Sequence, residues 1–211
     1  MKAKNSKPKI AVILGPTATG KSGLAVRLAR KFNGEVISAD SRQVYRSMDI
    51  GTGKITKKEM LGVPHHLLDV ASPRDRFTVT RFQKLAERAI REIVRRGKLP
   101  IICGGTGLYI DALLYGWKLP DIKPDWRLRK KLEKKSTEKL FVRLKKIDPK
   151  RSATIDEHSR RRLIRALEIV IQTGESAYSN VLENNRISRY EVLKLGVDWP
   201  DEELKKRISE R

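Results

Sequence analysis

One stretch decides the fold: Gly15-Pro16-Thr17-Ala18-Thr19-Gly20-Lys21-Ser22, which fits the pattern G-x-x-x-x-G-K-[ST] of a phosphate-binding loop. An apolar run, residues 10–14, precedes it and is typical of a buried parallel strand. An amphipathic stretch, residues 22–32, follows it and predicts a helix. The glycines let the backbone curl until successive N–H groups face one anion, and the helix N-terminus adds a favourable dipole. The sequence therefore predicts an α/β core whose loop holds a phosphate or diphosphate.

Three side chains near this loop suit chemistry on a phosphate ester. Lys21 can reach phosphate oxygens, and Ser22 can ligate Mg²⁺. Residues 34–40 read as a second parallel strand that ends in the carboxylate of Asp40. Because ligands in open α/β sheets bind outside the carboxyl ends of the strands, Asp40 is expected near the loop as a general base or a Mg²⁺ partner. The same residue type also suits a helix N-cap or a turn.

A second glycine-rich turn follows another apolar strand. Residues 99–103 predict the strand, and Gly104-Gly105-Thr106-Gly107 predicts the turn into the next helix. We expect this turn to form the opposite wall of the cleft. Cys103 is interpreted as a small core residue rather than a nucleophile. The adjacent His65 and His66 are interpreted as structural, because no further cluster of metal-ligating residues accompanies them.

The charge of the chain indicates a polyanionic partner. The 211 residues contain 47 Lys and Arg against 25 Asp and Glu, a formal net charge of +22. Nucleic acid is the favoured partner. A lysine-rich surface from a hot environment is the alternative, but it would be accompanied by more glutamate. No stretch resembles a membrane span, and a single cysteine allows no internal disulfide, so we expect a cytoplasmic protein without a membrane partner.

The composition predicts three segments. Residues 1–117 form the first part of the core, residues 118–190 a helical insertion, and residues 191–211 a return to the core. The insertion holds 20 basic and 10 acidic residues, which suits contacts with nucleic-acid phosphates. Residues 201–211 begin a helix within which the chain stops, so we expect that a C-terminal portion is missing and that the core is incomplete.

Seven stretches in this order resemble the tRNA dimethylallyltransferases, also called tRNA isopentenyltransferases. The phosphate loop alone is unspecific, whereas the ordered set is specific. Besides residues 15–22, the matching stretches are Asp40-Ser41-Arg42-Gln43-Val44-Tyr45, Met48-Asp49-Ile50-Gly51-Thr52-Gly53-Lys54, Pro64-His65-His66-Leu67-Leu68-Asp69, Gly104-Gly105-Thr106-Gly107-Leu108-Tyr109, Arg162-Leu163-Ile164-Arg165-Ala166-Leu167-Glu168 and Arg207-Ile208-Ser209-Glu210-Arg211.

The resemblance implies a fold and an activity. The fold is a core similar to P-loop NTPases, with a parallel sheet and an inserted helical subdomain that clasps the anticodon stem-loop of tRNA. The activity is transfer of a dimethylallyl group from dimethylallyl diphosphate to N6 of the adenosine just 3′ of the anticodon, in tRNAs that read codons beginning with U. The resemblance also implies that the loop, although of an ATP-binding type, holds the diphosphate of the prenyl donor. Mg²⁺ is the expected cofactor, and a monomer is expected.

The resemblance also implies roles for individual residues. The catalytic residues would be Asp40 as the base, with Lys21 and Arg211 on the diphosphate. The donor diphosphate would bind to Gly15, Pro16, Thr17, Ala18, Thr19, Gly20, Lys21 and Ser22, with Ser22 on Mg²⁺. The residues that would contact tRNA are Asp40, Ser41, Arg42, Gln43, Thr106, Arg161, Arg162, Leu163, Ile164 and Arg165.

The residues themselves leave other functions open. A P-loop kinase acting on small molecules or nucleotides would explain the loop and Asp40, but not the basic insertion. A nucleic-acid-binding module whose loop only switches conformation would explain the charge, but not the carboxylate at the strand end. A prenyltransferase acting on free adenylates is disfavoured by the charge of +22.

Overall fold

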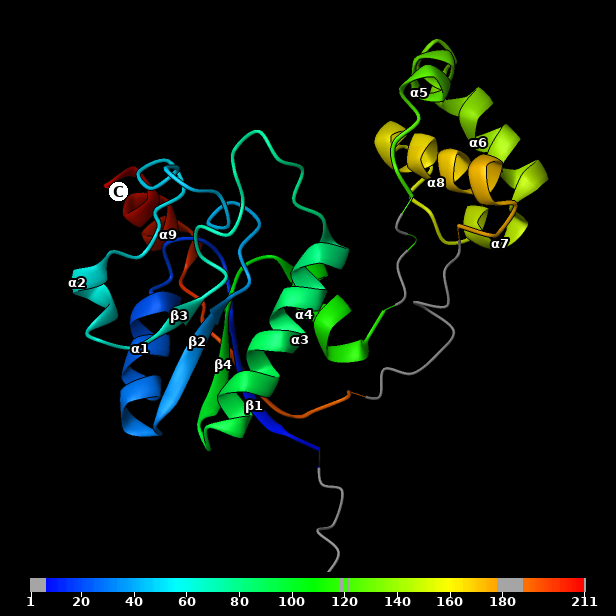
Figure 1. Cartoon of the computed structure of the whole chain (residues 1–211). Coiled ribbons are helices and arrows are strands. Elements are labelled where there is room, and N and C mark those ends of the chain that lie inside the picture. Colours follow the sequence, from blue (N-terminus) through cyan, green and yellow to red (C-terminus); the bar gives the residue numbers. More distant parts are fainter. Residues whose placement is uncertain (1–6, 118–119, 121, 178–187, 211) are drawn as a thin grey trace, which may run out of the picture. The chain divides into compact units, whose positions relative to one another are not determined.

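The computed structural model describes residues 7–117, 120, 122–177 and 188–210. The chain forms two compact units (Figure 1). The core unit comprises residues 1–116 and 186–211, and the helical unit comprises residues 117–185. The sequence-based borders lay at 117/118 and 190/191. No helix among the described residues has the length and apolar character needed to cross a membrane.

The core unit is built on a five-stranded sheet in the order β3-β2-β4-β1-β5. Its strands are β1 (Lys9–Leu14), β2 (Gly34–Ser38), β3 (His65–His66), β4 (Leu99–Gly104) and β5 (Glu191–Gly196). Every neighbouring pair is parallel. The carboxyl ends of the strands therefore meet at one edge of the sheet, where open α/β sheets place their ligands.

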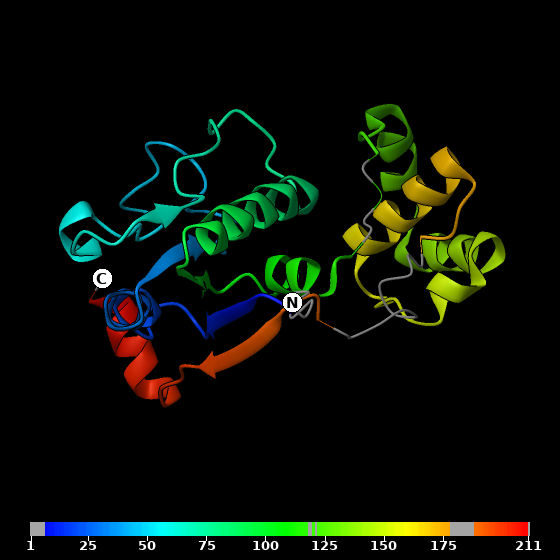
Figure 2. The same ribbon diagram turned by 60° about the horizontal axis from the view of Figure 1, so that its bottom comes forward.

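Both faces of the central strands β1, β2 and β4 are buried, and alternate residues of each strand point to opposite sides of the sheet. Ile10 and Val12 pack with residues of α3 (Val79–Arg95) and α4 (Gly107–Tyr115) in one apolar cluster. Ala11 and Ile13 pack with residues of α1 (Lys21–Lys31) in another. Figure 2 shows this arrangement, with α3 and α4 on one face of the sheet and α1 on the other. The sheet with helices on both faces confirms the predicted α/β class.

Two further helices of the core unit are short. The helix α2 (Lys57–Met60) begins with a capping box, in which Thr56 and Glu59 satisfy each other's backbone N–H groups. The last helix, α9 (Asp201–Ser209), follows β5. In Figures 1 and 2, α9 lies beside the amino end of α1, so the end of the described chain returns to the phosphate loop.

The helical unit contains α5 (Trp126–Glu133), α6 (Thr137–Ile147), α7 (Pro149–Ser152) and α8 (Arg160–Thr173). Asp125, Ser136 and Asp148 cap the first three of these helices through side-chain oxygens that accept backbone N–H bonds. A separate apolar cluster fills the unit and includes Leu132, Leu140 and Leu163. The unit therefore has a core of its own.

One fully buried carboxylate, Glu168 on α8, is bonded by two arginines. Arg129 donates to both of its oxygens at 2.8 and 2.6 Å, and Arg165 donates to Oε2 at 2.6 Å. The Asp125 N–H adds a bond of 2.8 Å. Burial by itself would raise the pKa of Glu168, but these hydrogen bonds outweigh it and lower the pKa to about 2. The triad ties α5 to α8.

Gly15 marks a place where two segments come too close for any other residue. A Cβ atom at this position would lie 2.1 Å from the Val197 carbonyl oxygen, just beyond β5. We expect Gly15→Ala to lower the free energy of unfolding by about 2–3 kcal/mol, because the backbone must move or remain strained. Urea unfolding followed by circular dichroism measures this change.

Gly23 in α1 supplies a matched control for Gly15→Ala. A Cβ atom there meets nothing within 4 Å. Alanine is the better helix former, so Gly23→Ala is expected to stabilise the protein by about 0.5–1 kcal/mol. A Gly15→Ala variant as stable as the Gly23→Ala variant would show that the contact with Val197 does not constrain the loop.

Candidate functional site

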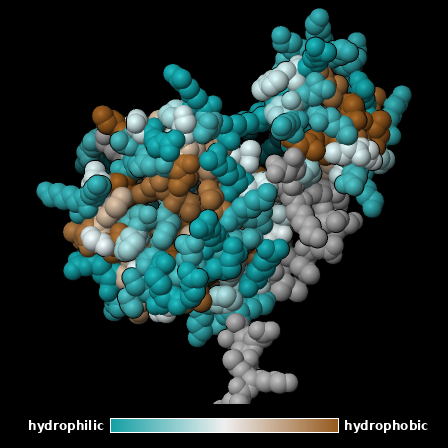
Figure 3. Space-filling model, viewed as in Figure 1, coloured by the Kyte–Doolittle hydropathy of each residue, from teal (hydrophilic) through white to brown (hydrophobic). Residues whose placement is uncertain are grey.

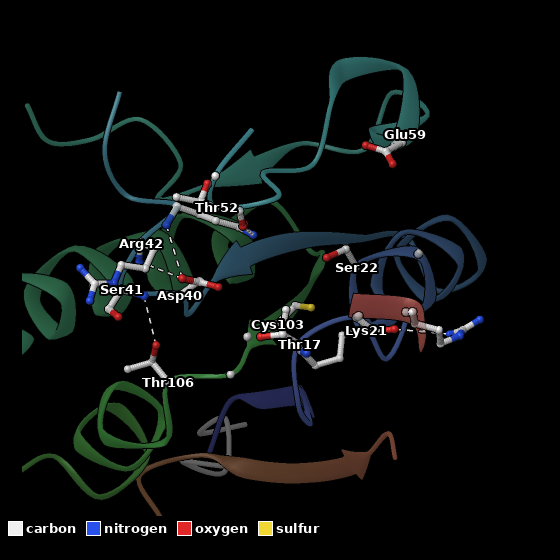
Figure 4. Close-up of a pocket in the computed structure, with 18 of the residues that line it drawn as sticks. Thr17, Lys21, Ser22, Asp40, Ser41, Arg42, Thr52, Glu59, Cys103 and Thr106 are labelled. Atoms are coloured by element: carbon white, nitrogen blue, oxygen red, sulfur yellow. Dashed lines mark hydrogen bonds between the residues drawn. The ribbon is translucent and has the colours of Figure 1, made fainter. Parts of the chain in front are cut away.

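A cavity of about 870 Å³ opens at the carboxyl edge of the sheet (Figure 4). Three loops after strands meet there. The phosphate loop after β1 contributes Thr17, Ala18 and Gly20, followed by Lys21 and Ser22 at the start of α1. The segment after β2 contributes Asp40, Ser41, Arg42 and Gln43. The end of β4 and the turn after it contribute Cys103, Gly104, Gly105 and Thr106. The structure thus brings most of the predicted site residues of the core unit together around one space.

The phosphate loop has the curled backbone that the sequence predicted. Ala18 and Gly20 adopt left-handed conformations, with φ of 64° and 86°. The Lys21 ammonium donates to the Pro16 carbonyl oxygen and, at 3.4 Å, to Thr19 Oγ1. Lys21 and Ser22 both line the cavity. The loop therefore presents a cation and a hydroxyl group to the same space, at the N-terminus of an 11-residue helix.

Asp40 lies two residues beyond β2 and caps a turn. Its Oδ1 accepts the Arg42 N–H at 2.8 Å and the Gln43 N–H at 3.4 Å. Asp40 therefore forms the predicted turn and also lines the cavity, where its predicted role in chemistry stays a prediction. In Figure 4 the carboxylate lies between the Arg42 segment and the phosphate loop.

The turn after β4 is joined directly to the Asp40 segment. Thr106 Oγ1 accepts the Ser41 N–H at 3.0 Å, and the Thr106 N–H donates to the Ala39 carbonyl at 3.2 Å. Gly104 permits this approach, since a Cβ atom there would lie 2.2 Å from the Ala39 carbonyl oxygen. The predicted opposite wall is therefore bonded to the segment that carries Asp40.

A loop over the cavity is held by a buried ammonium group. The Lys54 side chain is 5% exposed and donates to Asp49 and Asp69 at 2.6 Å each and to the Tyr45 carbonyl at 2.8 Å. Burial would lower the pKa of Lys54, but the two carboxylates outweigh it and raise it. The ammonium group therefore stays charged and fixes the loop in which Gly51 and Thr52 line the cavity.

Cys103 and the histidines have structural roles. Burial raises the pKa of the Cys103 thiol to about 11, which favours the protonated thiol at neutral pH. His66 Nε2 lies 2.7 Å from the buried carboxylate of Glu35, and His65 Nδ1 lies 2.8 Å from the Val63 carbonyl oxygen. Across the described ranges, no three His, Cys, Asp or Glu residues form a group that could hold a metal ion.

Sequence reasoning assigned no role to several residues that line the cavity. Arg207, Lys206, Glu203 and Glu210 come from α9 and its end, and Glu59 comes from α2. Two signals pointed to this segment: the i, i+4 spacing of Glu203 and Arg207, whose charged groups lie 3.4 Å apart, and the matching stretch of residues 207–211. Arg211, predicted to bind the diphosphate, lies outside the described residues.

The predicted tRNA-contacting segment 161–165 begins α8 of the helical unit. Arg161 and Arg162 are exposed. Leu163 and Ile164 are buried, at 0% and 8% exposure, so their side chains pack in the unit's core rather than face solvent. Arg165 is bonded to Glu168. The segment thus offers two exposed cations, and its other three side chains hold the helix in place.

The net charge of +22 is not concentrated in the cavity. Figure 3 shows hydrophilic side chains over most of the face in view, with smaller areas of apolar side chains. The cavity wall itself is balanced. It carries the cations Lys21, Arg42, Lys206 and Arg207 and the carboxylates Asp40, Glu59, Glu203 and Glu210. The excess positive charge therefore lies outside the cavity.

Comparison with known protein families shows to which family the chain belongs. The sequence profile of the family described as IPP transferase matches residues 43–211. The chain belongs to the IPP transferase family. Curated relatives of the chain include the tRNA dimethylallyltransferases of Thermomicrobium roseum, 46% identical over 98% of the chain, and Anoxybacillus flavithermus, 44% identical over 96%. The chain spans 64% and 65% of the lengths of these relatives.

Solved structures agree with this relationship. The full-length tRNA isopentenylpyrophosphate transferase of Bacillus halodurans is 45% identical to the chain with a TM-score of 0.65. The match covers 97% of this chain and 64% of that one. A eukaryotic dimethylallyltransferase, solved acting on tRNA, is 32% identical with a TM-score of 0.79, over 96% of this chain and 52% of that one. The comparisons do not favour the kinase that the phosphate loop alone left open.

Proposed function

We propose that the protein transfers a dimethylallyl group from dimethylallyl diphosphate to N6 of the adenosine just 3′ of the anticodon, in tRNAs that read codons beginning with U. One observation carries the proposal for a chain of this family: the phosphate loop and the Asp40 carboxylate line a single cavity. An anion-binding loop and a proton acceptor are the two components that such a transfer needs.

The reaction joins a weak nucleophile to an allylic carbon. The adenine N6 attacks the first carbon of the dimethylallyl group while the bond from that carbon to the diphosphate oxygen breaks. The N6 proton passes to the Asp40 carboxylate, and pyrophosphate leaves with the electron pair of the broken bond. Asp40 suits the role of base because its Oδ1 already accepts two backbone N–H bonds, which hold the carboxylate in place.

Charge on the leaving pyrophosphate would be stabilised by the loop. Lys21 and the N–H groups at the start of α1 supply this stabilisation, and one well-placed donor of this kind contributes about 3 kcal/mol. The Ser22 hydroxyl lines the same cavity and would hold Mg²⁺. Mg²⁺ takes few ligands from proteins and the rest from phosphate and water, so the residues present fit this ion. When bound, Mg²⁺ neutralises diphosphate charge.

The acceptor would be a tRNA whose target base leaves its stack to enter the cavity. Ser41, Arg42, Gln43 and Thr106 line the cavity beside Asp40 and are the proposed contacts for the base and its neighbours. In the helical unit, the exposed Arg161 and Arg162 are the proposed phosphate contacts. We further propose that the protein acts in the cytoplasm and as a monomer.

Prenyl transfer tests the proposal directly. The protein is incubated with Mg²⁺, dimethylallyl diphosphate and a tRNA that reads a codon beginning with U, and the digested nucleosides are analysed by mass spectrometry. We expect adenosine that carries the mass of one dimethylallyl group. A tRNA with guanosine at the target position lacks the N6 amine and is expected to give no product.

Two results would contradict the proposal. One is the absence of product under conditions in which both tRNA and pyrophosphate bind. The other is transfer of phosphate from ATP to a small acceptor, which would restore the kinase interpretation.

A further inference from the structure

Two side chains from outside the phosphate-loop motif donate hydrogen bonds to the backbone of that loop. The indole Nε1–H of Trp199, between β5 and α9, donates to the Thr19 carbonyl oxygen at 3.1 Å. The guanidinium Nη1 of Arg207, on α9, donates to the Ala18 carbonyl oxygen at 3.4 Å. These contacts join residues separated by 180 and 189 positions, so the sequence motif by itself does not predict them.

The two donors support each other. The Arg207 guanidinium lies over the Trp199 ring, 4.1 Å from its centroid. Its Nε lies 3.4 Å from Glu203 Oε1 on the same helix. Stacking on one side and an ion pair along the helix restrict the guanidinium group, and the guanidinium in turn restricts the ring. Both donors are therefore held in place before any ligand binds.

Bonding a carbonyl oxygen also orients an N–H group. In a planar trans peptide the C=O and the following N–H point in opposite directions, and the described residues contain no cis peptide. The Thr19 carbonyl belongs to the same peptide unit as the Gly20 N–H, and the Ala18 carbonyl to the same unit as the Thr19 N–H. Fixing the Thr19 oxygen on the indole therefore directs the Gly20 N–H away from the indole.

The direction of the Gly20 N–H matters because of where Trp199 lies. Gly20 lines the cavity, whereas Trp199 is not among the residues that line it. The peptide that Trp199 bonds thus has its oxygen turned to the indole and its Gly20 N–H turned away from it. A donor on the oxygen also polarises the peptide and strengthens the opposite N–H as a donor.

We propose that Trp199 is a positioning residue that pre-orients the Gly20 N–H group toward the bound diphosphate, and that Arg207, stacked on its ring, holds the indole in place. The inference rests on the proposed function only in taking the anion to be a diphosphate. It adds to the motif a second group of residues, supplied by the segment that follows β5. The diphosphate site of the loop is then complete only when α9 is packed against it.

Pyrophosphate binding by the Trp199→Phe variant tests the inference. Phenylalanine keeps an aromatic ring under Arg207 and removes only the Nε1–H. Calorimetry is expected to show pyrophosphate affinity reduced about fivefold to tenfold, the size of one hydrogen bond. The loss should not change with salt, because no charge is removed. Trp126→Phe is the matched control, since Trp126 also stacks with an arginine but lies in the helical unit; its affinity is expected to equal that of the unsubstituted protein.

Amide resonances separate positioning from a general loosening of the loop. In ¹⁵N-labelled protein titrated with pyrophosphate, Trp199→Phe should reduce the shift of the Gly20 amide and leave the Thr19 amide nearly unchanged. Arg207→Leu removes the group that is stacked on the indole and should also reduce the Gly20 shift, so it provides a second test should Trp199→Phe fold poorly. A uniform change of all loop amides would overturn the inference, as would unchanged affinity in both variants. Pyrophosphate binding that follows these expectations without prenyl transfer would support the inference and contradict only the proposed function.

Discussion

The Asp40→Asn variant is expected to transfer dimethylallyl groups about 10²–10⁴-fold more slowly than the unsubstituted protein, which is the usual contribution of a positioned general base. Asparagine keeps an oxygen that can accept the Arg42 and Gln43 N–H bonds, at 2.8 and 3.4 Å in the native turn. The turn is therefore retained while the proton acceptor is lost. Affinity for tRNA should be nearly unchanged. Single-turnover transfer and a tRNA-binding titration measure the two quantities separately.

Asp75→Asn is the control for Asp40→Asn. Asp75 also caps an exposed turn, where its Oδ2 accepts the Ser72 N–H at 3.2 Å, but it does not line the cavity. Its replacement should leave transfer unchanged. Equal losses of transfer rate and tRNA affinity in Asp40→Asn would contradict the assignment of Asp40 as the base and would favour a role in binding alone.

The second large effect concerns stability. Glu168→Ala is expected to lower the free energy of unfolding of the helical unit by about 3–5 kcal/mol, because it leaves Arg129 and Arg165 without the carboxylate that they share. Their side chains are only 17% and 34% exposed, so water replaces the lost partner poorly. Hydrogen exchange of the α8 amides, followed by mass spectrometry in increasing urea, measures the change in this unit.

The pH dependence of the Glu168 effect has a defined sign. The folded-state pKa of about 2 lies below the ordinary value of 4.5, so the contribution of the triad is fully present above about pH 4.5 and is lost as the pH falls toward 2. The difference between Glu168→Ala and the unsubstituted protein should shrink over that range. Glu157→Ala is the control, because Glu157 is 54% exposed and its pairing with His158 at 3.7 Å is expected to contribute less than about 1 kcal/mol. A Glu168→Ala variant as stable as this control would show that the triad does not stabilise the unit.

Much of the core was predictable because its signals are local. The glycines, the lysine and the flanking apolar runs of residues 15–22 specified a strand, a curled loop and a helix, and the structure contains β1 and α1 at those places. The strand rule placed Asp40 and Thr106 at the same edge, and both line the cavity. Parallel strands bring their carboxyl ends together whatever the loops contain, so this part of the site follows from element order alone.

Which side chains of a helix are covered depends on what packs against it. The resemblance implied tRNA contacts for residues 161–165, which stays a prediction; in the structure Leu163 and Ile164 are buried and Arg165 bonds Glu168. In α3, likewise, Ile90 is buried while Val94, one turn later, is 39% exposed. Periodicity shows that a helix has an apolar side, but the partner that packs on it decides where that side ends.

The sequence by itself determined that a phosphate-binding loop, a carboxylate at a strand end and a basic helical insertion occur in one chain, because each depends on residues close together in the sequence. Only the tertiary structure decided which distant groups complete the loop. Trp199 and Arg207 reach the carbonyl groups of Thr19 and Ala18 across 180 and 189 positions. Such contacts are set by the place of β5 beside β1 in the sheet. The position of β5 brings the following helix, α9, to the phosphate loop. The residues around the loop or around α9 do not by themselves indicate this position.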